Sequence, residues 1–364
     1  MNQYHRFQPL KILAYAERSL LPIVRGEMPY PIDWRIYPSN RCNHCCEWCV
    51  FRQNREQFDY PEMLSEELLL KAVTDASSTN AVFIEFTGGG EPLQNQHTIK
   101  ALEHAQFCSS NRIACGGAKL TVGLTTNGRY LSQTVAMQCN TIRVSLNAGT
   151  PEQHHKTNHG GKGRGDWEAI IDNIRQATSC RLGDLGLAFV VDADNWRDIP
   201  PFVRLAAGLG VDFAHIRPAF WYDTAEDAKV RAIMPDALRL CDQAKAEVAG
   251  CKTQIHALTS AFDGYWTPRE YHRCRAVLTG MCLRATGNFA VCQDRVDLTF
   301  GNVPSYRDGA TFQEVWHSQE HKDIVAKIHD GCGGELPRCP RCVWNSRNQA
   351  IESLEHDSLR LGIV

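Results

Sequence analysis

Hydrophobic and polar positions alternate between two periods along most of the chain, which predicts strands and helices in regular succession. Short apolar runs rich in β-branched residues indicate strands at residues 31–39, 81–87, 119–125, 141–146, 185–191 and 212–216. Apolar residues spaced three or four apart indicate helices at residues 65–78, 97–109, 166–177, 199–209 and 234–249, and one beginning near Leu131. Six strand-then-helix units with short links predict a parallel sheet with right-handed crossovers.

The periodicity allows either a doubly wound open sheet or a partial (β/α)6 TIM-type barrel, and ligands bind at the carboxyl ends of the strands in both. The order of the motifs described below favours the barrel, which we place at residues 31–250. Residues 1–30 form a leading segment with one amphipathic helix at 10–24. From residue 251 the pattern changes to a hairpin at 285–300 and two helices, near Phe312 and Ile324. We therefore assign residues 251–364 to a small C-terminal domain.

Length and composition fit a large globular domain with a smaller one beside it. The chain has 364 residues, of which 43% are hydrophobic. Its net charge of −2 gives no general attraction to nucleic acid or to an anionic membrane. No apolar run approaches the roughly 18 residues of a membrane span, and the N-terminus lacks the apolar core of a signal peptide. We expect a cytoplasmic protein that binds neither nucleic acid nor membrane.

The sixteen cysteines are more than a chain of this size needs for packing. In a reducing cytoplasm they are ligands or buried thiols rather than disulfides. Cys42, Cys46 and Cys49 have the spacing C-x3-C-x2-C, so one loop can bring three thiolates to one metal centre. A [4Fe–4S] cluster usually takes four thiolates, and three leave one iron open to a ligand that is not protein. A structural zinc site is the alternative, and Cys45 is interpreted as a bystander.

This loop, with Trp48 before its last cysteine, resembles the signature loop of the radical S-adenosylmethionine (SAM) superfamily. In that superfamily the amino and carboxylate groups of SAM chelate the open iron of the cluster. The resemblance implies a [4Fe–4S] cluster on Cys42, Cys46 and Cys49, with SAM as the second cofactor. It also implies that Trp48 covers the cluster and the adenine edge, although a lone Trp is more often a core residue.

Polar and glycine-rich segments follow the predicted strands. Thr87-Gly88-Gly89-Gly90-Glu91-Pro92 could be a simple turn, but it resembles the motif that holds the SAM amino group. Polar residues at the next strand ends could be caps, or could bind the ribose and carboxylate of SAM as they do in the superfamily. The cofactor-binding candidates are therefore Trp48, Gly89, Gly90, Glu91, Thr126, Asn127, Ser145, Asn147 and Asp192. Asn147 stands at a position where members of the superfamily commonly have Asp. For Asp192 the alternative to cofactor binding is a structural role.

Another polar segment contains His154, His155 and His159, followed by a glycine-rich stretch at residues 160–165. A histidine cluster can bind metal, but no ligand spacing is evident here. We interpret the segment as a mobile lid over the barrel mouth.

A second group of cysteines lies in the C-terminal part, at Cys274, Cys292, Cys339 and Cys342. Two thiols from a hairpin and two from a later C-x2-C pair suit a zinc ribbon as well as a cluster. The C-x12-G-x4-C spacing and the terminal C-x2-C resemble the SPASM/twitch extension of radical SAM enzymes. No further cysteine follows Cys342, so the resemblance implies the twitch form with one auxiliary [4Fe–4S] cluster on these four residues. Cys282 and Cys332 are spare, and with them a second auxiliary cluster is the alternative.

The resemblance implies a radical SAM oxidoreductase that takes hydrogen from a small polar molecule such as a sugar, cyclitol or nucleoside. The auxiliary cluster would accept the substrate's electron, as in the twitch dehydrogenase of aminoglycoside biosynthesis. A flavodoxin or ferredoxin would supply the electron that starts the cleavage of SAM. Only 41 residues precede Cys42, too few for the leader-binding domain of many peptide-modifying members. Epimerisation, decarboxylation, peptide modification and a non-catalytic zinc module are the alternatives. Arg217 and Tyr222 are the candidate catalytic residues, although a structural role is the alternative for Arg217.

Overall fold

The computed structural model describes residues 15–53, 62–79, 81–163, 165–257, 271–293, 295, 297–331, 342 and 344–361. In this part of the chain one sheet of ten strands has the order β10-β9-β8-β1-β2-β3-β4-β5-β6-β7. Its parallel core consists of β1 (Asp33–Ile36), β2 (Phe83–Phe86), β3 (Thr121–Thr126), β4 (Thr141–Ser145), β5 (Asp184–Val191), β6 (Phe213–Pro218) and β7 (Gln254–Ala257).

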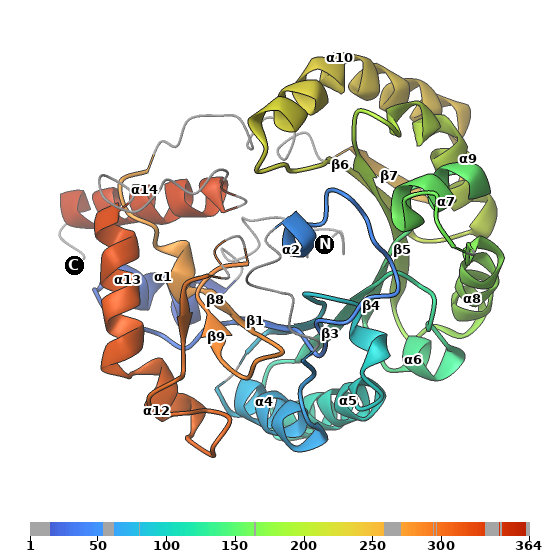
Figure 1. The fold of residues 1–364 in the computed structure, drawn as a ribbon. Coiled ribbons are helices and arrows are strands. Elements are labelled where there is room, and N and C mark those ends of the chain that lie inside the picture. The colour runs from blue at the N-terminus through green and yellow to red at the C-terminus, as the bar shows by residue number, and fades with distance from the viewer. Residues whose placement is uncertain are drawn as a thin grey trace.

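The sheet curves into an open crescent with helices around its outer side (Figure 1). These helices are α4 (Glu66–Ser78), α5 (Thr98–Ala114), α6 (Gln133–Met137), α8 (Trp167–Cys180), α9 (Ile199–Leu209) and α10 (Thr224–Glu247). Strands buried from both sides are continuously apolar: all four residues of β2 and seven of the eight in β5 are buried. The predicted α/β architecture, a partial barrel whose sheet does not close, is confirmed.

The histidine-rich segment is a helix, so its interpretation as a lid loop was wrong. Helix α7 (Pro151–His159) begins after Thr150, whose side chain accepts a hydrogen bond from the Gln153 amide. Proline suits the first turn of a helix because its missing N–H has no helical partner there. The helix ends at Gly160, whose φ of 59° is the left-handed conformation typical of a helix C-terminus. The Thr-Pro pair and the glycine could therefore have predicted the start and the end of this helix from the sequence.

The C-terminal part continues the same sheet instead of forming a sheet of its own. Strand β8 (Gly280–Leu283) pairs in parallel with β1, on the side opposite β2. Strands β9 (Phe289–Ala290) and β10 (Thr299–Phe300) follow in antiparallel pairing. The hairpin therefore starts earlier than the predicted residue 285, and β7 also lies beyond residue 250. Strands on both sides of residue 250 belong to one sheet, so the sheet does not mark a boundary there. The division of the chain into domains at residue 250 stays a prediction.

Aromatic side chains join the C-terminal part to the first strand. Trp34 of β1 is fully buried, with its ring centroid 4.3 Å from that of Phe312 and 6.1 Å from that of Phe289. Phe312 opens α12 (Phe312–Trp316), which precedes α13 (Gln319–Gly331). Figure 1 shows these helices beside β8 and β9, with α14 (Asn345–Leu361) nearby. Helix α14, which the sequence pattern did not reveal, packs against α1 (Ala16–Val24).

Of the helices that the structure describes, none is both long enough and apolar enough to cross a membrane.

Candidate active site

A cavity of about 570 Å³ lies at the carboxyl ends of the parallel strands. This volume is in the range of small-molecule and cofactor sites. The polar and metal-binding candidates that line it are Cys42, Cys46, Trp48, Cys49, Gly89, Gly90, Glu91, Thr126, Asn127, Ser145, Asn147 and Arg217. The structure thus brings together, at one end of the barrel, residues that the sequence spreads over 176 positions, from 42 to 217.

The cysteine loop is held over the cavity by contacts to two other segments. The amide of Cys45 donates a hydrogen bond of 2.7 Å to the carbonyl oxygen of Asn158 in α7. Helix α2 (Val50–Gln53) follows the loop directly, and its Gln53 side chain donates to the carbonyl oxygens of Trp48 and Phe220, at 2.9 and 3.0 Å. The loop conformation is therefore fixed by the barrel rather than by the loop alone.

The three thiols form a donor set that requires a cation. Burial raises the pKa of Cys42 to about 12. Burial also raises the pKa of Cys46 and Cys49, and the neighbouring thiols Cys49 and Cys42 add to the effect at Cys46. Thiols in such surroundings stay protonated unless a metal supplies positive charge, in which case they ionise and bind it. Three mutually close sulfurs facing a shared cavity, with room left beside them, fit a [4Fe–4S] cluster with one open iron and a bound SAM.

The glycines after β2 are required for a close approach of two protein segments. A Cβ atom on Gly90 would lie 2.1 Å from the carbonyl oxygen of Arg41, and one on Gly89 would lie 2.5 Å from Oδ1 of Asn40. The Gly90 amide donates to Ser39 O at 2.9 Å. These glycines thus seat the turn against the segment leading into the cysteine loop.

Glu91 is buried and its carboxylate is fully engaged with the protein. Oε1 accepts hydrogen bonds from Thr126 Oγ1 at 2.7 Å and from the Leu93 amide at 3.1 Å, while Oε2 accepts one from the Asn127 amide at 2.7 Å. Burial raises the pKa of Glu91 to about 7 despite these bonds. The carboxylate therefore ties the turn after β2 to the end of β3. A direct contact with the SAM ammonium stays a prediction.

Asn147 also has a backbone-fixing role. Its φ of 60° is left-handed, a conformation that Asn tolerates better than most residues. Its Oδ1 accepts a hydrogen bond from the Val190 amide at 3.1 Å, and its Nδ2 donates to Asn158 Oδ1 at 3.4 Å. Because β4 ends at Ser145, Asn147 lies beyond the strand. Both still line the cavity.

Two candidates are not among the residues that line the cavity in the described part of the chain. Asp192 accepts a hydrogen bond from the Trp221 indole at 3.0 Å, which gives its buried carboxylate a structural partner. Tyr222 is 38% exposed, and its amide bonds to Gln53. Their roles stay predictions without support from this geometry.

The sequence analysis missed a buried charge cluster on the cavity floor. Glu85 of β2 lies 3.3 Å from the Arg35 guanidinium and 3.7 Å from that of Arg143, and Thr125 donates to it at 2.6 Å. Burial alone would raise the pKa of Glu85, but Arg143 and Arg35 lower it below its ordinary value. The sequence did contain a signal for this cluster, namely single charged residues within otherwise apolar strands. Charged residues are rarely buried unless they are paired, so each one predicts a partner of opposite charge.

The second cysteine group is only partly described, because Cys332 and Cys339 lie outside the described residues. Tyr271 donates a hydrogen bond to Cys342 Sγ at 3.1 Å, and Asn348 donates to Cys274 Sγ at 3.6 Å. The segments that carry Cys274 and Cys342 therefore lie side by side. Cys282 is instead buried in β8, where the Tyr37 hydroxyl lies 3.6 Å from its sulfur. This set of ligands stays a prediction.

Comparison with known proteins gives relatives for the barrel. Residues 36–206 match the family model of the radical SAM superfamily. The "Probable GTP 3',8-cyclase" of Methanocaldococcus jannaschii is 27% identical over 180 residues, which are 48% of this chain and 55% of that protein. The "GTP 3',8-cyclase" of Desulforamulus reducens is 27% identical over 188 residues, 50% of this chain and 53% of that one. The chain thus spans about half the length of these relatives.

Solved structures match over more of the chain at lower identity, and so report on the fold. Streptococcus suis SuiB bound to S-adenosylmethionine has a TM-score of 0.62 at 13% identity, covering 87% of this chain and 73% of that one. Native anSMEcpe with bound AdoMet has a TM-score of 0.60 at 12% identity, covering 90% and 100%. The three-thiol cavity, the barrel and these matches agree with the sequence resemblance and with its two cofactors, a [4Fe–4S] cluster and SAM. Residues 36–206, 171 of the 364 residues, therefore carry a radical SAM domain.

Proposed function

We propose that this protein is a radical SAM oxidoreductase that removes hydrogen from a small polar substrate of the sugar, cyclitol or nucleoside class. When bound, the cofactors supply a 5′-deoxyadenosyl radical that abstracts hydrogen and an auxiliary cluster that accepts an electron. An alcohol becomes a carbonyl compound by losing one hydrogen atom from carbon, one proton from oxygen and one electron. The hydrogen atom would leave in 5′-deoxyadenosine, and an auxiliary cluster held by the four C-terminal cysteines would accept the electron. A flavodoxin or ferredoxin provides the electron that starts each turnover.

The charge of the cavity supports a substrate that carries an anionic group. Arg35, Arg52, Arg143 and Arg217 line it together with the carboxyl groups of Glu85 and Glu91, and Asp33 lies 4.0 Å from Arg35, so arginines outnumber the carboxyl groups around them. Guanidinium groups bind phosphate and carboxylate in a bidentate manner. A phosphorylated or carboxylated sugar or nucleoside fits this lining better than a neutral one. The single observation that carries the substrate proposal is this arginine-lined floor beside the three thiols.

Contacts between the cavity and the second cysteine group support the electron-transfer role. Trp344, two residues after Cys342, lies between two guanidinium groups, with its ring centroid 5.0 Å from Cζ of Arg35 and 4.0 Å from that of Arg347. Arg35 lines the cavity, as does Gln293, the residue after Cys292. An auxiliary cluster on Cys274, Cys292, Cys339 and Cys342 would thus adjoin the substrate site, close enough to receive an electron.

A second candidate is cyclisation of a nucleotide. It is favoured by the sequence relatives, whose names say that they act on GTP. The arginines would serve such a substrate equally well. Nucleotide cyclisation leaves the ribose–base unit joined by a new bond and yields no ketone, so the products separate the two functions.

Deuterium transfer tests the proposal directly. The reduced protein is incubated with SAM and with carbon-deuterated sugar phosphates, cyclitol phosphates or nucleotides. We expect one class to move deuterium into 5′-deoxyadenosine and to yield a carbonyl product two mass units lighter than the unlabelled substrate. Deuterium transfer together with a cyclised nucleotide as the product would support the second candidate. Transfer from a peptide alone would contradict both.

Cys342→Ala should separate the two halves of the reaction. We expect the variant to cleave SAM at a rate within about twofold of wild type, because the first cluster is intact. Product formation should fall at least tenfold, since the substrate electron loses its acceptor. Cys115→Ala, which removes an exposed cysteine at the end of α5, is the control and should change neither rate. Normal product formation by Cys342→Ala would refute the electron-transfer role.

Arg217→Ala should weaken substrate binding more than catalysis. Loss of one charge-assisted contact to an anionic substrate costs about 1.5–3 kcal/mol, or roughly a 10- to 100-fold rise in KM. Arg239→Ala, on the exposed face of α10, is the matched control and should leave KM unchanged. An unchanged KM for Arg217→Ala would remove this residue from the substrate site.

A further inference from the structure

We propose that His44, His154, His159 and Asp166 bind a zinc ion that ties the cysteine loop to helix α7. The site is distinct from the iron–sulfur centre and adds to the proposed function without depending on it. Its four residues come from three segments. His44 lies in the cysteine loop, two residues from both Cys42 and Cys46, while His154 and His159 lie on α7 and Asp166 precedes α8.

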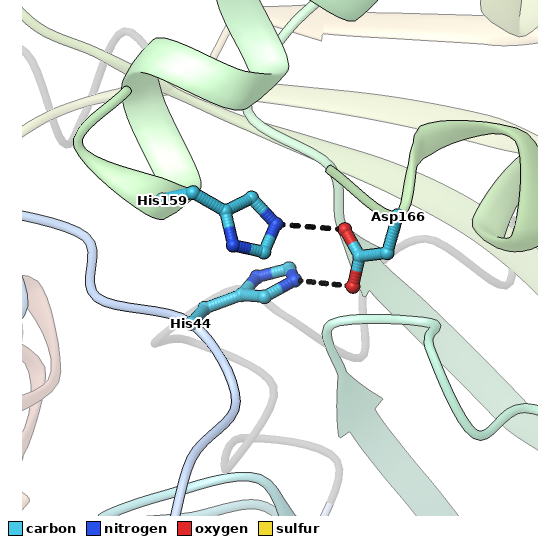
Figure 2. Close-up of side chains that lie close together, drawn as sticks. All are labelled: His44, His159 and Asp166. Carbon is cyan, nitrogen blue, oxygen red and sulfur yellow. Dashed lines mark hydrogen bonds and ion pairs between the residues drawn. The ribbon is translucent and has the colours of Figure 1, made fainter. Parts of the chain in front are cut away.

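Three of the four side chains already converge. Figure 2 shows the imidazoles of His44 and His159 facing the carboxylate of Asp166. His44 Nε2 lies 3.1 Å from Oδ2, and His159 Nε2 lies 2.8 Å from Oδ1. The ligand atoms of these three residues all lie within 4.8 Å of one another. Two atoms that bind one tetrahedral ion at roughly 2.0–2.2 Å lie about 3.3–3.6 Å apart, so small shifts of these three side chains would let them share an ion.

His154 provides the observation that a hydrogen-bonded cluster does not explain. Its side chain is fully buried, and neither ring nitrogen has a hydrogen-bond partner among the described residues. Nδ1 lies 3.9 Å from Asp166 Oδ1, and the ring centroid is 5.6 Å from that of His44 and 5.8 Å from that of His159. A buried polar group without a partner costs about 1–3 kcal/mol. Ligation of a metal by Nδ1 offsets that cost and supplies the fourth ligand.

The donor chemistry selects zinc over the hard divalent cations. Three imidazole nitrogens and one carboxylate suit zinc, whereas magnesium and calcium prefer oxygen ligands. Four protein ligands leave no open position, which is typical of a structural rather than a catalytic zinc.

The zinc would act on the loop that binds the iron cluster. The loop already contacts α7 through the bond between the Cys45 amide and Asn158, and Asn43 donates to Asp166 Oδ2 at 3.3 Å. A bound ion adds metal–ligand bonds to these contacts, so the cysteines stay in position when no iron is present. We therefore expect zinc to increase the yield of cluster assembly on the apoprotein.

The test measures zinc in the full-length protein purified anaerobically with its iron. We expect roughly one zinc per chain by mass spectrometry, and a first shell at the zinc X-ray absorption edge that contains only nitrogen and oxygen, at roughly 2.0–2.1 Å. His154→Ala and His159→Ala should each lose at least tenfold of the zinc while retaining iron. His104→Ala, on α5 beside Thr74, is the control and should keep both metals.

The X-ray absorption spectrum of the wild-type protein tests the proposal even if a histidine variant fails to fold. Sulfur at roughly 2.3 Å from zinc would place the ion in the cysteine sites and overturn the proposal. So would wild-type protein without zinc after incubation with zinc chloride, or full zinc retention in His154→Ala. Wild-type protein with a sulfur-free shell of four nitrogen and oxygen ligands would support it even where a variant does not fold.

Discussion

Replacing Cys46 by alanine should abolish reductive cleavage of SAM. The variant keeps two of the three thiols that line the cavity, and two thiolates do not hold a cluster that needs three from the protein. It also removes the contact of 3.2 Å between Cys46 Sγ and Asn158 Oδ1. We expect about half or less of the wild-type iron and no 5′-deoxyadenosine above background. Iron analysis and chromatography of the reaction with dithionite measure these two quantities.

The neighbouring Cys45→Ala is the matched control, since it removes the same atom, a cysteine sulfur, from the same loop. Cys45 also borders the cavity, but its spacing does not fit the ligand pattern. We expect the control to retain iron and to cleave SAM at close to the wild-type rate. If Cys45→Ala lost as much iron as Cys46→Ala, or if Cys46→Ala cleaved SAM normally, the assignment of the three ligands would be wrong.

Gly90→Ala should cost both stability and affinity for SAM. The added Cβ would lie 2.1 Å from the carbonyl oxygen of Arg41 and 2.6 Å from the carbonyl carbon of Asn40, so backbone must move. The turn has no freedom to yield, because the Gly90 amide bonds to Ser39 and the Glu91 amide bonds to Arg41 at 2.7 Å. Overpacking of this kind costs about 1–3 kcal/mol. We expect a loss of that size in denaturant unfolding and at least a tenfold weaker binding of SAM by calorimetry.

Gly208→Ala makes the same chemical change where there is room for it. Gly208 lies in α9, and a Cβ there would meet nothing within 4 Å. Alanine is a better helix former than glycine by about 0.8–1.0 kcal/mol, so the free energy of unfolding should rise slightly and SAM binding should not change. Equal behaviour of the two variants would show that the turn after β2 is not tightly packed.

The sequence predicted the barrel because each unit repeats the same physical signal. Strands such as β2 and β5 are buried on both sides and therefore read as apolar runs, and helices such as α8 carry one apolar stripe. The short elements escaped. Strand β7 has four residues, of which only Ile255 is buried, so no apolar run identifies it. Helix α7 is polar on most positions because it covers the cysteine loop rather than the core.

The site was predicted where residues stand in a fixed local spacing, as the cysteines do. Pairings between strands were not accessible in this way. Arg35 and Glu85 are 50 residues apart, and only the parallel register of β1 and β2 places them beside each other. The ionic role of Glu85 depends on this register, whereas the bonds of Glu91 and the meeting of His44 with Asp166 depend on which loops the fold brings together. The order of residues along the chain does not specify these contacts between distant segments.

The position of β1 in the middle of the sheet has a consequence for biosynthesis. Its neighbour β8 begins at Gly280, more than 240 residues after β1 ends at Ile36. While the ribosome is still making the intervening chain, β1 presents an unpaired backbone edge, which is a template for association with other chains. Truncations that end before Gly280 should therefore aggregate, even though they contain every residue of the superfamily match.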